Sequence, residues 1–137
     1  ERLISERLID FIRVHVSTIG GLSIARKLAA FCEFFGVRTA WHGPGDVSPV
    51  GHAANLALDL STTNFGIQEL HIFGDIAREV FPGTPEHRDG MLWSNERPGL
   101  GIDIDEALAG KYPFPEYELM HQNFPPVRRV DGSAIRW

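Results

Sequence analysis

The sequence has little cysteine, no long apolar run and no excess of basic residues. Cys32 is the only cysteine among 137 residues, which excludes an internal disulfide and a zinc site made of cysteines, so we expect a cytosolic protein. No apolar run approaches the roughly 20 residues of a membrane span, and the charged first residues do not resemble a signal peptide. The 13 basic and 18 acidic residues give a net charge of −5, which argues against a nucleic-acid partner because phosphates are neutralised by Lys and Arg. We therefore expect neither a nucleic acid nor a membrane as a partner.

Proline is also scarce in the first part of the chain. Only two of the nine prolines precede residue 74, and proline and glycine mark loops and turns. This distribution predicts a regular segment over residues 1–73 and a loop-rich segment over 74–137. The total length suits one ordinary domain, and 43% apolar with 23% charged residues is typical of a folded protein.

Strand and helix patterns alternate in the first segment. Apolar residues at alternate positions predict a strand over 9–17, and apolar residues at three- and four-residue steps predict a helix over 22–35. A short strand at 37–41 comes next. A helix over 49–60 then begins behind a serine cap and an N-terminal proline, and a strand at 65–70 follows it. Strands separated by helices of this length predict an α/β fold with a parallel sheet.

Three polar side chains lie near the ends of the predicted strands at equal intervals of 27 residues: His15, His42 and Glu69. One strand–helix unit separates each from the next, so they should meet beyond the carboxyl ends of the parallel strands, where α/β proteins place their sites. Arg13 shares the strand face of His15. A buried Arg and His in a strand would cost several kcal/mol unless they were paired. The spacing therefore predicts a functional site, with satisfied structural histidines as the alternative.

Other polar residues carry weaker signals. Asp46 follows a Gly-Pro-Gly loop and is either a site residue or a turn acid. We expect His52 to be exposed or to pack within its helix, and His71 and His87 have no constellation around them. The acidic run at 103–106 is expected to cap a short helix.

Several strings of residues are distinctive in combination. They are WHGPGD (41–46), SPVGH (48–52), NFGIQE (64–69), GLGIDID (99–105) and KYP (111–113), together with the strand 9–17. This combination resembles the D-mannonate dehydratase/D-galactonate dehydratase-like family, which includes starvation-sensing proteins. That family lies within the mandelate racemase/muconate lactonizing enzyme group of the enolase superfamily. The resemblance covers essentially the whole chain.

The resemblance implies a larger (β/α)8 barrel of the TIM type. Residues 1–73 would supply the last three βα units, strands six to eight. Residues 74–137 would form a tail that packs toward an N-terminal capping domain absent from this chain. The family's cofactor is Mg²⁺, whose three carboxylate ligands end strands three to five, upstream of Glu1, so we expect no metal ligand here. The implied partners are a sugar-acid substrate, the rest of the barrel and the capping domain, and a homo-oligomer is expected.

The resemblance also implies roles for individual residues. Arg13 matches a substrate-binding arginine, and Asp46 matches a polar contact to the hydroxyls of the sugar acid. His42 matches the histidine that donates a proton to the departing hydroxyl, and Glu69 matches the acid that hydrogen-bonds the substrate. No role is implied for His15.

The implied reaction is dehydration of D-mannonate, D-gluconate or both to 2-keto-3-deoxy-D-gluconate. Pro44 departs from efficient mannonate dehydratases, which have alanine there, and resembles members with weak activity, a preference for D-gluconate or no activity found. Two alternatives therefore stay open. One is a catalytically weak or inactive family member with a binding or regulatory role, and the other is a free-standing fragment without activity.

Overall fold

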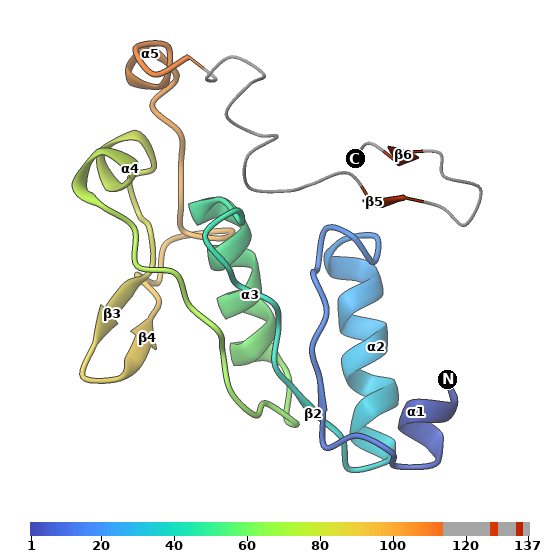
Figure 1. Cartoon of the computed structure of the whole chain (residues 1–137). Coiled ribbons are helices and arrows are strands. Elements are labelled where there is room, and N and C mark those ends of the chain that lie inside the picture. Colours follow the sequence, from blue (N-terminus) through green and yellow to red (C-terminus); the bar gives the residue numbers. More distant parts are fainter. Residues whose placement is uncertain (114–126, 129–133, 136–137) are drawn as a thin grey trace. The chain divides into compact units, whose positions relative to one another are not determined.

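The computed structural model describes residues 1–113, 127–128 and 134–135 (Figure 1). The chain forms two compact units, Glu1–Glu106 and Ala107–Trp137. Every residue assigned to the candidate site belongs to the first unit. Much of the predicted tail, residues 114–126, 129–133 and 136–137, lies outside the described residues.

The first unit contains four short or medium helices and two pairs of strands. In chain order these elements are α1 (Arg2–Ser5), β1 (Phe11–Ile12), α2 (Leu22–Phe34), β2 (Arg38–Thr39), α3 (Pro49–Ser61), α4 (Asp75–Val80), β3 (Glu86–Arg88) and β4 (Met91–Trp93). A further short helix, α5 (Glu106–Ala109), follows the acidic run, as predicted. In the second unit, β5 (Val127–Arg128) and β6 (Ala134–Ile135) pair in antiparallel fashion.

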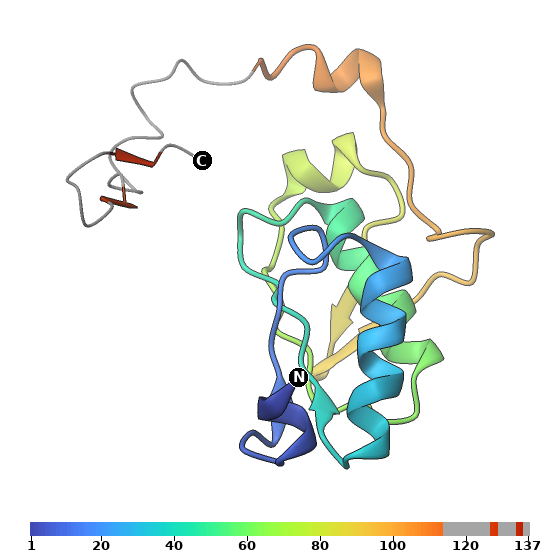
Figure 2. The same ribbon diagram turned by 90° about the vertical axis from the view of Figure 1, so that its right-hand side faces the viewer.

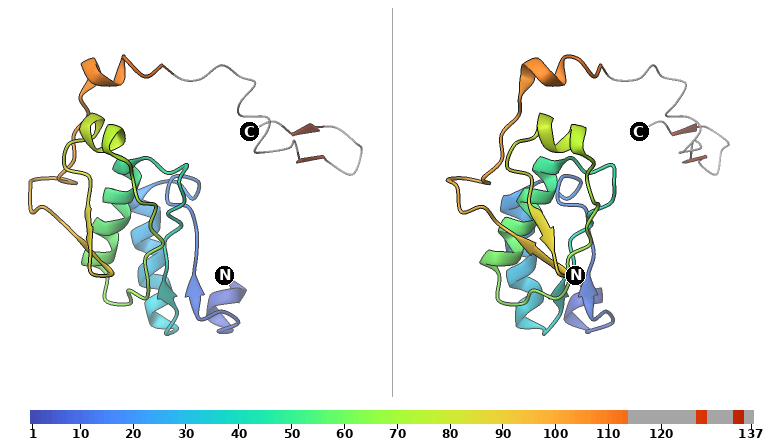
Figure 3. Two further views of the ribbon diagram at one scale, coloured as in Figure 1. Left: turned by 60° about the vertical axis from the view of Figure 1, so that its left-hand side comes forward. Right: turned by 90° about the vertical axis from the view of Figure 1, so that its left-hand side faces the viewer.

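The α/β alternation and the parallel pairing are confirmed. β1 and β2 are parallel, with Phe11 opposite Arg38, and α2 and α3 follow them at the predicted positions. The α3 helix begins as expected, because the Ser48 hydroxyl accepts a hydrogen bond from the Gly51 N–H at 3.2 Å. Figures 2 and 3 show α2 and α3 side by side along the β1 and β2 segments.

The strands are much shorter than the patterns predict. The expected strand over 9–17 is reduced to two residues, and the chain turns at His15, whose carbonyl accepts the N–H groups of Thr18 and Ile19. The expected strand over 65–70 contributes only an isolated parallel bridge between Thr39 and Phe65. At Trp41, a side chain takes the place of a backbone donor, because Gln68 Nε2 donates a hydrogen bond to the Trp41 carbonyl at 3.0 Å.

The core lies between the two long helices and the strand ends. Ala25 and Ala29 of α2 pack with Leu58 of α3 against the fully buried Trp41. The small alanine side chains let α2 approach the indole closely, so the backbone just before His42 is held by the core. This packing fixes the base of the candidate site.

Within the described residues, no helix is long and apolar enough to cross a membrane.

Candidate functional site

The structure brings the predicted strand-end residues together. Arg13 Nη2 donates to both carboxylate oxygens of Glu69, to Oε2 at 2.8 Å and to Oε1 at 2.9 Å. His42 Nε2 lies 3.6 Å from Glu69 Oε2. Residues separated by 56 positions in the sequence therefore form one cluster, as the 27-residue spacing predicted.

Backbone hydrogen bonds set the position of this cluster. The His42 N–H donates to the Val14 carbonyl at 3.0 Å, which continues the parallel ladder beyond β1 and β2. The side-chain amide of Asn55 in α3 donates to the His42 carbonyl at 3.2 Å. Both backbone groups of His42 are thus fixed by neighbouring elements, so the protein framework positions its ring.

Gly43 brings the WHGPGD loop into direct contact with Glu69. Its N–H donates to Glu69 Oε2 at 3.0 Å. A Cβ at this position would lie 2.1 Å from the Glu69 carbonyl oxygen, a backbone atom that has little room to move. Only glycine therefore fits between the Gly43 and Glu69 segments.

Glu69 is an ionised carboxylate at neutral pH. The Gly43 N–H makes the largest contribution to lowering its pKa, and the hydrogen bond and charge of Arg13 and the charge of His42 act in the same direction. Burial opposes them but does not reverse the shift. A fixed negative charge thus stands between the Arg13 guanidinium and the His42 ring.

His15 adds a second imidazole to the cluster. Its ring centroid lies 5.6 Å from that of His42, and the two ring planes are nearly perpendicular at 79°. The Ser17 hydroxyl lies 2.8 Å from His15 Nδ1, within hydrogen-bond distance.

A pocket of about 400 Å³ opens beside the two histidines. Its lining includes His15, His42, Asp46 and Ser17. Asp46 is exposed and lies at the pocket, but in the described part of the chain it makes no hydrogen bond or ion pair with Arg13, His42 or Glu69. A pocket of this size, with a few polar groups beside it, suits a small polar molecule.

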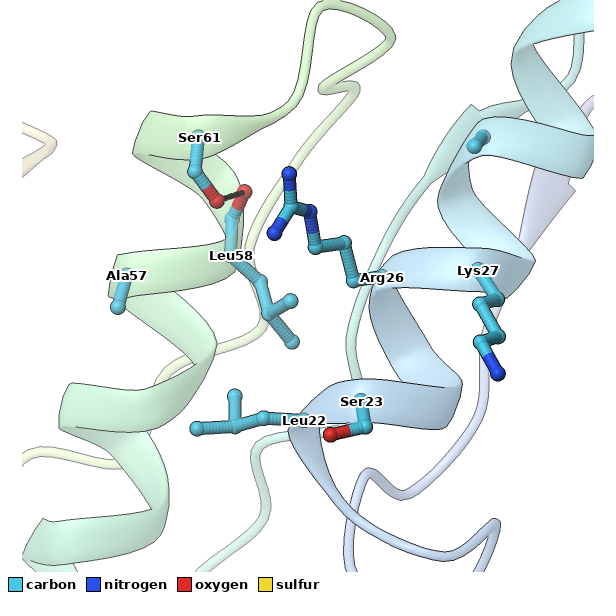
Figure 4. Close-up of a pocket in the computed structure, with 8 residues that line it drawn as sticks. Leu22, Ser23, Arg26, Lys27, Ala57, Leu58 and Ser61 are labelled. Atoms are coloured by element: carbon cyan, nitrogen blue, oxygen red, sulfur yellow. Dashed lines mark hydrogen bonds between the residues drawn. The ribbon is translucent and has the colours of Figure 1, made fainter.

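A larger pocket of about 600 Å³ lies elsewhere, between α2 and α3 (Figure 4). It is lined by residues such as Leu22, Arg26, Lys27, Leu58 and Ser61. Its lining contains no histidine or carboxylate and none of the clustered residues Arg13, His42 and Glu69. We therefore assign the site to the smaller pocket.

The sequence reasoning missed one supporting group. His52, predicted to be exposed or to pack, is buried and donates through Nε2 to the Pro44 carbonyl at 3.3 Å, and burial lowers its pKa, so its ring is neutral at pH 7. Its ring also packs on Phe73 at 5.0 Å, and His71 packs on the same Phe73 at 5.0 Å. Strand and helix periodicity gives no sign of these contacts, which join the α3 helix to the segment after Glu69.

The described residues do not form a magnesium site by themselves. They contain no group of three or more His, Cys, Asp or Glu side chains placed to hold a metal ion. The Glu69 carboxylate, the carboxylate of the cluster, is already occupied by Arg13 and the Gly43 N–H. Mg²⁺ requires several oxygen ligands in octahedral geometry, and this donor set does not supply them.

Polar groups that follow neighbouring parallel segments and lie beside a pocket occupy the place where α/β proteins put their sites. The sequence model of the family described as "Enolase C-terminal domain-like" matches residues 1–108. The chain therefore belongs to this family, as the resemblance predicted.

Curated relatives are closely similar along nearly the whole chain. A D-galactonate dehydratase family member from Salmonella enteritidis is 65% identical over 134 residues, which cover 98% of this chain and 31% of that protein. A member from Musicola paradisiaca is 62% identical over 138 residues, with the same two shares. The chain thus spans about a third of the length of these relatives.

Solved structures agree with the family. The crystal structure of an enolase from Pantoea ananatis with bound D-gluconate and Mg is 58% identical, with a TM-score of 0.80, over 82% of this chain and 27% of that chain. A mandelate racemase/muconate lactonizing enzyme from Jannaschia is 25% identical, with a TM-score of 0.71, over 80% of this chain and 28% of that one.

Proposed function

We propose that this chain is the C-terminal part of a Mg²⁺-dependent sugar-acid dehydratase acting on D-gluconate, D-mannonate or both. The observation that carries the proposal is the Arg13–Glu69–His42 cluster beside the 400 Å³ pocket. It occurs in a chain that is 65% identical to a D-galactonate dehydratase family member and 58% identical to a structure with bound D-gluconate and Mg.

Dehydration of a sugar acid needs a base for the proton beside the carboxylate and an acid for the departing hydroxyl. We assign the acid to His42, which would transfer a proton from Nε2 to the leaving oxygen as the C–O bond breaks, so that water departs. The enol that remains converts to the 2-keto-3-deoxy acid. A positioned general acid contributes about 10²–10⁴-fold to such a step, and histidine suits it because its ordinary pKa lies near neutral pH.

Arg13 and Asp46 are assigned to substrate recognition. The planar guanidinium offers several donors to carboxylate or hydroxyl oxygens, and the Asp46 carboxylate accepts hydrogen bonds from hydroxyls. Glu69 would hydrogen-bond a substrate hydroxyl with the carboxylate that Arg13 and Gly43 hold in place.

Magnesium is the proposed cofactor because the Pantoea ananatis structure contains it with D-gluconate. Since the described residues do not form its site, we assign its ligands, together with the base, to parts of a longer protein that precede Glu1. The same proposal includes completion of a (β/α)8 barrel, a capping domain that contacts the tail, a homo-oligomeric assembly and a cytosolic location.

A second candidate function rests on Pro44. This residue fixes its own backbone torsion and lies between His42 and Asp46 in a loop held by His52. By the family resemblance, proline here accompanies weak activity, a preference for D-gluconate or no activity found. The first and the last of these favour a member that binds sugar acids in a regulatory role.

The full-length protein distinguishes these functions when it is incubated with Mg²⁺ and each sugar acid. A dehydratase converts D-gluconate or D-mannonate to a 2-keto-3-deoxy acid, and a chelator abolishes the conversion. A binding protein gives a calorimetric signal with the same compounds but no keto product. If neither product nor binding is found with these sugar acids, both proposals fail.

A further inference from the structure

We propose that His15 is a positioning residue that holds the His42 ring in its reactive orientation, and that Ser17 in turn holds His15. This inference rests on the proposed function, because it concerns the proton donor of that reaction. Neither the family resemblance nor the spacing of the strand ends assigned a task to His15.

The first observation is that hydrogen bonding alone does not fix the His42 ring. Its Nε2 lies 3.6 Å from Glu69 Oε2, which is longer than a hydrogen bond. The backbone of His42 is held at both its N–H and its carbonyl, so the remaining freedom is rotation of the ring. Packing must therefore select the ring orientation.

The second observation is that the His15 ring provides this packing. The two rings lie 5.6 Å apart and nearly perpendicular at 79°, an arrangement that aromatic rings favour. The two residues come from neighbouring segments joined by the hydrogen bond from the His42 N–H to the Val14 carbonyl. Because this bond limits movement of the backbones relative to each other, the contact between the rings is a fixed one.

The third observation is that His15 is itself held. Ser17 Oγ lies 2.8 Å from Nδ1, and the His15 carbonyl accepts the N–H groups of Thr18 and Ile19 at 3.1 and 3.2 Å. The turn therefore places the serine hydroxyl beside the ring. A chain of contacts runs from Ser17 through His15 to His42 and Glu69.

The position of this chain of contacts distinguishes it from ordinary core packing. His15, Ser17 and His42 all line the 400 Å³ pocket, and none of the three is buried in the core. The charged groups of the site are Arg13 and Glu69 in the cluster and Asp46 at the pocket. His15 therefore acts where the orientation of His42 matters for a bound molecule.

The test compares His15→Ala, His15→Phe and Ser17→Ala in the full-length protein with Mg²⁺ and D-gluconate. A misplaced catalytic group loses rate rather than substrate affinity, so we expect His15→Ala to lower kcat about 10-fold or more with KM nearly unchanged. His15→Phe keeps a flat ring but loses the hydrogen bond to Ser17, and Ser17→Ala loses the same bond. The kcat of both variants should therefore lie between those of His15→Ala and the wild type. Thr18→Ala removes the neighbouring hydroxyl and serves as the control, with unchanged kcat.

Two kinetic results would overturn the inference. One is a His15→Ala variant with wild-type kcat. The other is a His15→Phe variant as slow as His15→Ala, since the imidazole itself would then take part in the chemistry. The melting temperature of each variant is compared with that of the wild type, so that a slow variant is distinguished from an unfolded one.

A crystal structure of the His15→Ala protein tests the inference without any activity. We expect the His42 ring to rotate and its Nε2 to move away from Glu69 Oε2. An unchanged ring would refute the positioning role. If the wild-type protein dehydrates no sugar acid, the proposed function fails, and this structure still decides whether His15 positions His42.

Discussion

Replacement of Gly43 by alanine should damage the site and the fold together. The new Cβ would lie 2.1 Å from the Glu69 carbonyl oxygen, 3.0 Å from His52 Cε1 and 3.1 Å from Gln68 Nε2. The closest of these is a backbone atom, so the Gly43 and Glu69 segments must move apart. Overpacking of this kind costs about 1–3 kcal/mol, and the hydrogen bond from the Gly43 N–H to Glu69 would be lost as well.

The assay is thermal unfolding of the full-length protein, with Gly74→Ala as the matched control. A Cβ at Gly74 would meet no atom within 4 Å, and its φ of −71° is allowed for alanine. A loss of about 2 kcal/mol corresponds to roughly 4–8 °C in a domain of 150–250 residues. The control should melt near the wild type. Equal melting temperatures for Gly43→Ala and Gly74→Ala would refute the close approach of Gly43 to Glu69.

Three further predictions concern a buried acid, the central carboxylate and the isolated chain. Burial raises the pKa of Asp59 from 3.8 to about 7, so the free energy of unfolding should fall as the pH rises from about 4 through 7. At 1.4 kcal/mol per pKa unit, Asp59→Asn should gain roughly 4 kcal/mol of stability relative to wild type between pH 4 and pH 8, measured by denaturant unfolding. A stability difference that does not change with pH would contradict this. Glu69→Gln should raise KM and lower kcat for the preferred sugar acid, because Arg13 loses its charged partner. A change in only one of these constants would contradict a role of Glu69 in both substrate binding and turnover. Residues 1–137 expressed alone should aggregate or lack a cooperative melt, since large apolar side chains such as Phe34 and Ile67 are exposed at 88% and 63%, and a sharp monomeric transition would contradict this.

The helices were predictable because their signals are local. The apolar spacing of α2 and the serine cap with Pro49 that begins α3 depend only on neighbouring residues, and both helices lie within a residue or two of the predicted bounds. Strand lengths were not predictable in the same way. They depend on whether a partner supplies backbone hydrogen bonds, and at Trp41 the side chain of Gln68 supplies the bond instead.

The sequence pattern predicted that the residues after the strands would lie together, but it did not predict their individual contacts. Equal spacing of His15, His42 and Glu69 sufficed to place them together, because consecutive parallel strands end at the same edge. The support of the loop by the buried His52 was not predictable, since it depends on the three-dimensional path of the loop and not on a residue pattern. The contact of His15 with His42 is of the same kind.

The assignment of His42 as the proton donor is tested most directly by His42→Asn in the full-length protein, with His87→Asn, an exposed histidine in β3, as the control. Dehydration of D-gluconate and D-mannonate is measured beside exchange of the α-proton in deuterated water. Loss of the general acid should lower kcat for dehydration by about 10²-fold or more, while α-proton exchange stays measurable because the base lies elsewhere. Abolished exchange with normal dehydration of a pre-formed intermediate would mean that His42 is the base and would contradict the assignment.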